Sequence, residues 1–83
     1  MKILYFSWLR SKVGTPEEEV ALPDGIADVQ GLIDWLKTRS PGYAEAFADL
    51  KVVRCAVNQD YVEPAAPVGP DDEVAFFPPV TGG

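Results

Sequence analysis

The chain has 83 residues, of which 13 are acidic and seven are basic, so its formal net charge at pH 7 is −6. An acidic surface repels nucleic-acid phosphates and favours basic protein partners, so we expect a protein partner and no nucleic acid. A single cysteine and the absence of histidine exclude an intramolecular disulfide and a Cys/His metal site, and we expect a small domain that binds no metal and is not an enzyme by itself.

Two extended segments begin the chain. Lys2–Trp8 is rich in β-branched and aromatic residues, and we expect Leu9–Gly14 to follow it as a loop. Glu17–Leu22 is a second, more polar extended run that stops before Pro23-Asp24-Gly25. We expect these two strands to pair as a hairpin.

One amphipathic helix is predicted in the middle of the chain. Asp28 is a favoured N-cap residue, and the apolar positions after it recur at i, i+3, i+4 and i+7, as on one face of a helix. These positions are Val29, Leu32, Ile33 and Leu36. Ser40-Pro41-Gly42 is expected to end this helix, and Tyr43–Asp49 has enough helix formers for a further short helix.

The C-terminal half supplies the remaining strands. Val52–Val57 predicts a third strand, and the turn residues after it predict a hairpin with Tyr61-Val62. After a proline-rich connection, Glu73–Phe77 predicts the last strand. Two strands, a main helix and returning strands are typical of an α+β fold, the ubiquitin-like β-grasp, with a mixed sheet of about five strands and the helix across one face. We expect this domain to span residues 1–77.

Residues 78–83 are predicted to form an extended, flexible C-terminal tail. Pro78 and Pro79 fix φ and cannot donate ladder hydrogen bonds, so the chain must leave the sheet there. The residues after them have no charged side chain and are Val80, Thr81, Gly82 and Gly83. Extended, the tail could reach about 20 Å into a partner's pocket, and its diglycine end leaves the terminal carbonyl unhindered. Terminal glycines are often disordered without a function, but this combination of features favours a functional Gly83.

Three aromatic residues are candidates for a partner-binding surface. The first and last predicted strands are apolar on both faces, although a single helix can cover only one face. We expect Phe77 to contact a partner because it adjoins the tail, and we extend the same hypothesis to Phe6 and Tyr61. The alternative is that some of these side chains fill the core.

Other reactive or charged residues have simpler interpretations. Cys55 lies in an apolar strand and is expected to be a core residue. The runs Glu17–Glu19 and Asp71–Glu73 are expected to be solvated rather than to bind a metal. Arg10 and Lys12 could meet a partner's carboxylates or a nucleotide phosphate, and plain surface charge is an equal alternative. Since no apolar run approaches the ~18 residues of a membrane span, we expect no membrane association and a cytoplasmic protein.

Three segments of the chain resemble a known family, the small subunit of molybdopterin synthase, which is a sulfur-carrier protein of the ubiquitin-like group. They are the C-terminal DEVAFFPPVTGG (Asp72–Gly83), AVNQ (Ala56–Gln59) and the opening LYFSWLRSKVG (Leu4–Gly14). The resemblance covers the whole chain. A diglycine end is shared with other carriers and modifiers, whereas FPPVTGG preceded by DEVAF is specific to this family. The departures lie in the EPAAP loop and in surface charges, and they leave the tail unaffected.

The resemblance implies a sulfur-donating role for Gly83. In the family, an activating enzyme uses ATP and Mg²⁺ to adenylate the terminal glycine, and a sulfur donor protein then replaces AMP to leave a thiocarboxylate. The tail enters the large subunit of the synthase, a heterotetramer of two small and two large subunits. There it supplies sulfur to cyclic pyranopterin monophosphate to make the molybdopterin dithiolene. The resemblance thus implies that this chain binds no cofactor of its own.

Two other functions stay open at this point. A thiamine-type carrier would share the chemistry of Gly83 but would give its sulfur to a thiazole synthase. A ubiquitin-like modifier would instead join Gly83 to lysine side chains of other proteins.

Overall fold

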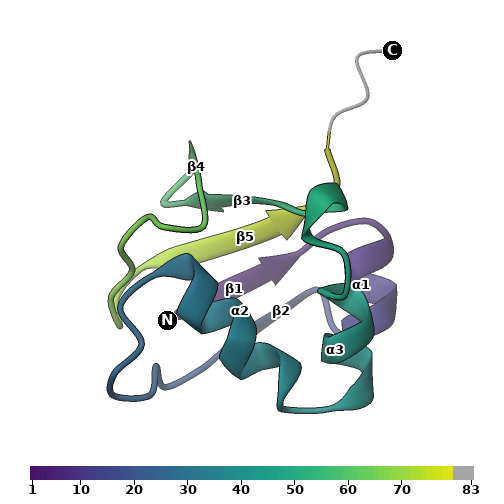
Figure 1. Ribbon diagram of the computed structural model, residues 1–83, viewed down its shortest axis with the longest axis horizontal. Helices are drawn as coiled ribbons and strands as arrows, with labels where there is room; N and C mark the ends of the chain where they lie inside the picture. Colours follow the sequence, from purple (N-terminus) through teal and green to yellow (C-terminus); the bar gives the residue numbers. More distant parts are fainter. Residues whose placement is uncertain (80–83) are drawn as a thin grey trace.

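A mixed sheet of five strands is the centre of the computed structural model, which describes residues 1–79 (Figure 1). The order of the strands across the sheet is β2-β1-β5-β3-β4. Strand β1 runs parallel to β5, and the other neighbouring strands are antiparallel. The elements are β1 (Lys2–Tyr5), α1 (Trp8–Val13), β2 (Glu17–Glu19), α2 (Val29–Lys37), α3 (Pro41–Ala46), the 3₁₀ helix η1 (Leu50–Val52), β3 (Arg54–Val57), β4 (Asp60–Val62) and β5 (Glu73–Phe77).

The alternation of side chains along the strands gives the sheet one face toward the helices and one open face. Ile3 and Tyr5 on β1 lie opposite Val74 and Phe76 on β5, and these four residues are almost completely buried. They join the apolar residues of α2 in one hydrophobic core. Figure 1 shows the helices gathered on this side of the sheet. The predicted β-grasp, with a mixed sheet and a helix across one face, is confirmed.

Helix α2 forms as the sequence predicts. The side chain of Asp28 accepts a hydrogen bond from the backbone N–H of Gly31 at 2.8 Å, which satisfies one of the free donors at the start of the helix. The apolar positions at helical spacing are all buried and are Val29, Leu32, Ile33 and Leu36. A cap and a buried stripe in register explain why this short segment is helical.

The segment after β1 is a helix, so the prediction of a strand to Trp8 and a loop to Gly14 was wrong. Ser7 has φ 58° and ψ −137°, a strained conformation for a residue with a side chain, and it turns the chain out of the sheet. Helix α1 then buries Leu9 and ends at Gly14, which has φ 96° and donates a hydrogen bond to the carbonyl of Arg10. The one-turn spacing of Leu9 and Val13 before a glycine was the available sequence signal.

Several element boundaries also differ from the predictions, among them the end of the short helix α3, which is Ala46 instead of Asp49. Strand β2 ends at Glu19 instead of Leu22, and β3 begins at Arg54 because the preceding residues form η1. The predicted stop at Pro41 is the first residue of α3, where the missing N–H of proline costs no hydrogen bond. A Cβ on Gly42 would overlap the backbone carbonyl oxygen of Lys12, so the glycine permits the close approach of α3 to α1.

Strand β5 ends at Phe77, as predicted, and Pro78 and Pro79 follow it outside the sheet. The remaining tail residues, Val80, Thr81, Gly82 and Gly83, lie outside the described residues. Within the described part, no helix is both long enough and apolar enough to cross a membrane.

Candidate functional site

The open face of the sheet presents a continuous apolar strip across its central strands. Leu4 lies opposite Ala75, Ala75 lies opposite Ala56, and Ala56 lies opposite Tyr61. Residues that face each other across a strand pair point to the same side of a sheet, so this strip belongs to the side away from the helices. Phe77 is two residues beyond Ala75 and continues the strip to the point where the chain leaves the sheet.

Two of the three predicted surface aromatics are exposed, and the third is partly covered. The exposed fraction is 49% for Phe6 and 80% for Tyr61. Phe77 is half-buried, and its ring centroid lies 5.5 Å from that of Tyr61. The core aromatic of β5 is its neighbour Phe76, which is completely buried on the helix side. The alternative that Phe6 and Tyr61 fill the core is therefore wrong.

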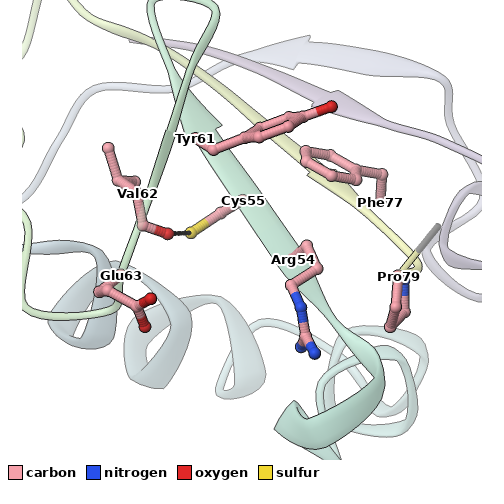
Figure 2. A pocket seen from close by; sticks show the side chains of 7 residues that line it. All are labelled: Arg54, Cys55, Tyr61, Val62, Glu63, Phe77 and Pro79. Carbon is pink, nitrogen blue, oxygen red and sulfur yellow. Dashed lines mark hydrogen bonds between the residues drawn. The ribbon is translucent and has the colours of Figure 1, made fainter.

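A surface pocket of about 420 Å³ is lined by Tyr61 and Phe77 and by the start of the tail at Pro79 (Figure 2). Its walls are mainly apolar, with one cationic and one anionic side chain. The lining residues are Arg54, Cys55, Tyr61, Val62, Glu63, Phe77 and Pro79. Figure 2 shows the rings of Tyr61 and Phe77 side by side and the guanidinium of Arg54 between Glu63 and Pro79.

Cys55 is a core residue, as predicted. It is 7% exposed, and its Sγ lies 3.4 Å from the backbone carbonyl oxygen of Val62, to which the thiol donates a hydrogen bond. Burial, and secondarily the charge of Glu63, raises the pKa of the Cys55 thiol. A thiol with a raised pKa supplies little thiolate at neutral pH, so the structure gives Cys55 no nucleophilic role.

Arg10 and Lys12 lie on α1 and not in the pocket. Lys12 Nζ is 3.8 Å from a carboxylate oxygen of Glu45 on α3, and Arg10 is exposed. Sequence reasoning missed the cation that does line the pocket, Arg54. Its signal was a charged residue within an otherwise apolar strand segment, Val52–Val57.

The acidic run of β2 is not uniformly solvated, which corrects the prediction for Glu18. Glu18 lies opposite Ile3 and therefore on the helix side of the sheet, where its carboxylate accepts hydrogen bonds from three side chains. The donors are Tyr43 Oη at 2.6 Å, Arg39 Nη1 at 2.7 Å and Tyr5 Oη at 2.8 Å. Burial raises the pKa of Glu18, but these hydrogen bonds outweigh it and hold the pKa below its ordinary value. The cluster joins β2 to the helix layer, and we assign it a structural role.

The acidic residues provide no metal site in the part of the chain that the structure describes. No group of three or more Asp, Glu, Cys or His side chains is arranged there to hold an ion. Asp72 accepts hydrogen bonds from Asn58 Nδ2 at 2.9 Å and from the backbone N–H of Gly69 at 2.8 Å, and these lower its pKa. It therefore fixes the loop before β5 instead of serving as a free ligand.

Comparisons with known proteins agree with this architecture. The model of the ThiS family matches residues 3–83. The molybdopterin synthase sulfur carrier subunit of Escherichia coli is 42% identical over 83 residues, which cover 100% of this chain and 99% of that protein. The human protein of the same name is 33% identical, with coverage of 100% and 93%.

Solved structures give the same result. Molybdopterin converting factor, subunit 1, of Pyrococcus furiosus superposes with a TM-score of 0.76 at 37% identity and covers 95% of each chain. SAMP1 of Haloferax volcanii superposes with a TM-score of 0.78 at 27% identity and covers 100% of this chain and 98% of its own. Together with the sheet order, these likenesses define a ubiquitin-like β-grasp protein. The chain belongs to the ThiS family.

Proposed function

We propose that this chain is the sulfur-carrier subunit of a molybdopterin synthase. The observation that carries the proposal is that the whole chain matches relatives of that name. The E. coli protein is 42% identical to this chain, and the match includes almost all of the E. coli protein's length. The exit of the chain from the sheet at Pro78 and Pro79 supports the proposal, because strand pairing ends there, before the diglycine of the sequence.

Gly83 is the residue that carries sulfur in this proposal. A carboxylate is a poor electrophile, so an activating enzyme first joins one of its oxygens to the α-phosphate of ATP, with Mg²⁺, and releases pyrophosphate. Sulfide-equivalent sulfur from a donor protein then displaces AMP and leaves a thiocarboxylate. ATP and Mg²⁺ belong to the activating enzyme, and because this step consumes ATP we propose a cytoplasmic location. The chain has no histidine, so the acid–base groups of the later steps belong to a partner.

The open face is the proposed docking surface for the large subunit. Tyr61 and Phe77 line the pocket with Pro79, and the backbone N–H of Phe6 donates to the carbonyl of Phe76 near the end of β5. Apolar side chains that are exposed or only partly covered in this way are typical of a protein interface. In a heterotetramer of two small and two large subunits, this contact would direct each tail into a large subunit. Thiocarboxylates delivered there convert cyclic pyranopterin monophosphate into the molybdopterin dithiolene.

Intact-mass measurement tests the function directly. The full chain is incubated with ATP, Mg²⁺, the activating enzyme and sulfide, and we expect a mass gain that corresponds to one oxygen replaced by one sulfur. A variant lacking Gly83 is the matched control and should show no gain. The loaded chain is then mixed with the large subunit and cyclic pyranopterin monophosphate, and molybdopterin should form. Lysine-linked adducts would indicate a modifier, and transfer only to a thiazole synthase would indicate a thiamine-type carrier.

A further inference from the structure

Arg54 occupies a distinctive place at the base of the tail. It is the first residue of β3 and lies directly opposite Phe77, the last residue of β5. Opposed residues share a face of the sheet, so Arg54 is on the open face with the apolar strip. Its side chain lines the same pocket as Pro79, the last described residue before the end of the tail (Figure 2). A group bound by Arg54 would therefore sit where the tail leaves the domain.

The guanidinium of Arg54 is held by the backbone and not by an acidic side chain. Its Nη1 donates to the carbonyl oxygens of Lys51 at 3.0 Å and Val53 at 3.1 Å. Among residues 1–79, no carboxylate lies within ion-pair distance of it, which is also true of Arg10, Lys37 and Lys51, whereas three other cationic side chains have such partners. Those three are Lys2, Lys12 and Arg39.

The two backbone hydrogen bonds fix the orientation of the Arg54 guanidinium and leave most of its N–H donors unused. A guanidinium carries five N–H groups, and the edge formed by Nε and Nη2 matches the two oxygens of a carboxylate. Both backbone hydrogen bonds of Arg54 come from Nη1. The Nε–Nη2 edge has no hydrogen-bond partner in the described structure and is available for a carboxylate. An arginine with a fixed orientation loses less side-chain entropy on binding than a mobile one.

The surroundings of Arg54 restrict the kind of partner group that fits. Tyr61, Val62 and Phe77 make most of the pocket apolar, while Glu63, also in its lining, would repel a carboxylate placed next to it. A suitable partner surface therefore has an apolar side chain for the pocket and a carboxylate on the side of Arg54 and Pro79.

The charge of Arg54 is opposite to that of the chain as a whole, which is −6. A net negative charge steers the chain toward a basic surface over a long range, but it does not select one orientation. A cation beside the exit of the tail can favour one orientation, because a placement that brings it next to a carboxylate is favoured over the others.

We propose that Arg54 binds a carboxylate of the large subunit beside the exit of the tail and that this ion pair sets the orientation in which the tail is delivered. The inference rests on the proposed function, because it takes the large subunit as the occupant of the open face. Continuity with the apolar strip beside the tail supports this occupant, and the net charge of −6 disfavours a second copy of the same acidic chain.

Calorimetric titration of the complete large subunit with single variants tests this inference. Arg54→Met retains an apolar stem but removes the charge, and we expect about tenfold weaker binding, or about 1.4 kcal/mol. Arg54→Lys retains the charge without the two-pronged edge and should lie between Arg54→Met and the wild type. Lys37→Met is the matched control, because Lys37 is exposed at the end of α2 and does not line the pocket. Its affinity should remain within about twofold of wild type.

A charge-reversal experiment identifies the partner group. Arg54→Glu should bind more weakly than Arg54→Met, and lysine substitution of one acidic residue of the large subunit should restore the affinity. Melting curves of all variants confirm that they are folded, and Arg54→Lys provides the comparison if Arg54→Met proves unstable.

The outcomes separate this inference from the proposed function. Equal affinities for Arg54→Met and Lys37→Met, or no lysine substitution that restores binding by Arg54→Glu, would overturn the role of Arg54 while the sulfur-carrier function stands. An effect of Arg54→Met confined to the Michaelis constant of adenylation would assign the residue to a phosphate and also overturn the inference. Failure of the wild-type chain to bind the large subunit would overturn both proposals.

Discussion

Two adjacent phenylalanines allow partner binding and folding to be tested separately. Phe76 and Phe77 follow each other on β5 and point to opposite faces of the sheet. Phe76 is completely buried, with its ring centroid 4.9 Å from Phe47 and 6.2 Å from Tyr5. Phe77 is half-buried on the open face, where it packs against Tyr61. We predict that Phe76→Ala mainly impairs folding and that Phe77→Ala mainly impairs binding of the large subunit.

The expected magnitudes differ enough to be resolved. Removing a completely buried phenylalanine ring costs about 3–5 kcal/mol of folding free energy, a large part of the ~4–12 kcal/mol expected for a chain of this length. At roughly 4–8 °C per kcal/mol for a domain of this size, Phe76→Ala should lower the melting temperature by at least about 12 °C. Phe77→Ala should cost only about 1 kcal/mol of folding stability. As a central interface residue, Phe77 should contribute at least about 2 kcal/mol to binding, or about 30-fold in affinity.

Thermal denaturation and calorimetric titration with the large subunit measure the two effects on the same samples. Phe76→Leu is a useful control, because its smaller volume change should leave a folded chain with nearly wild-type affinity. Two results would refute the reasoning. One is a melting temperature for Phe77→Ala as low as that of Phe76→Ala, which would make Phe77 a core residue. The other is wild-type affinity of folded Phe77→Ala, which would remove Phe77 from the interface.

Three further predictions concern the tail, the helix layer and the acidic cluster. Adding one residue after Gly83 should abolish sulfur loading in the mass assay without changing the melting curve, because it moves the reacting carbonyl by about 3 Å; normal loading would contradict a fixed reach. Gly42→Ala should destabilise the chain by about 1–3 kcal/mol in urea unfolding, because its Cβ would overlap the Lys12 carbonyl, whereas Gly69→Ala should be nearly neutral, since the nearest contact there is 3.9 Å away. Glu18→Gln should cost about 1–3 kcal/mol at pH 7, because it removes the ionised acceptor of three hydrogen bonds. Folding lowers the pKa of Glu18, so the stability that this carboxylate adds is complete above the pKa of the unfolded chain, about 4.3, and is lost as the pH falls below it. The unfolding free energies of wild type and Glu18→Gln should therefore become similar at low pH. A constant difference between them down to about pH 2 would contradict this cause.

Local sequence signals determined those helices and strands whose ends are set by residues within or next to them. Helix α2 has an N-cap at Asp28 and a complete apolar stripe, and both interactions lie within the helix or one turn of it. The bounds of β5 follow from its apolar run after Glu73 and from Pro78, which ends any ladder. These features made the β-grasp and the departure of the tail predictable, because they depend on residues that are close in the sequence.

The tertiary structure alone decided which apolar side chains face outward and what surrounds them. Phe76 and Phe77 are the same residue type, and only the register of β5 against β1 and β3 shows which of them lies under the helices. The same register turns Glu18 toward Tyr43 and Arg39, which are distant in sequence, and it places Arg54 opposite Phe77. A strand with apolar residues on both faces does not reveal which face is buried. The helices that cover one face of the sheet come from elsewhere in the chain, so only the tertiary structure shows which face they cover.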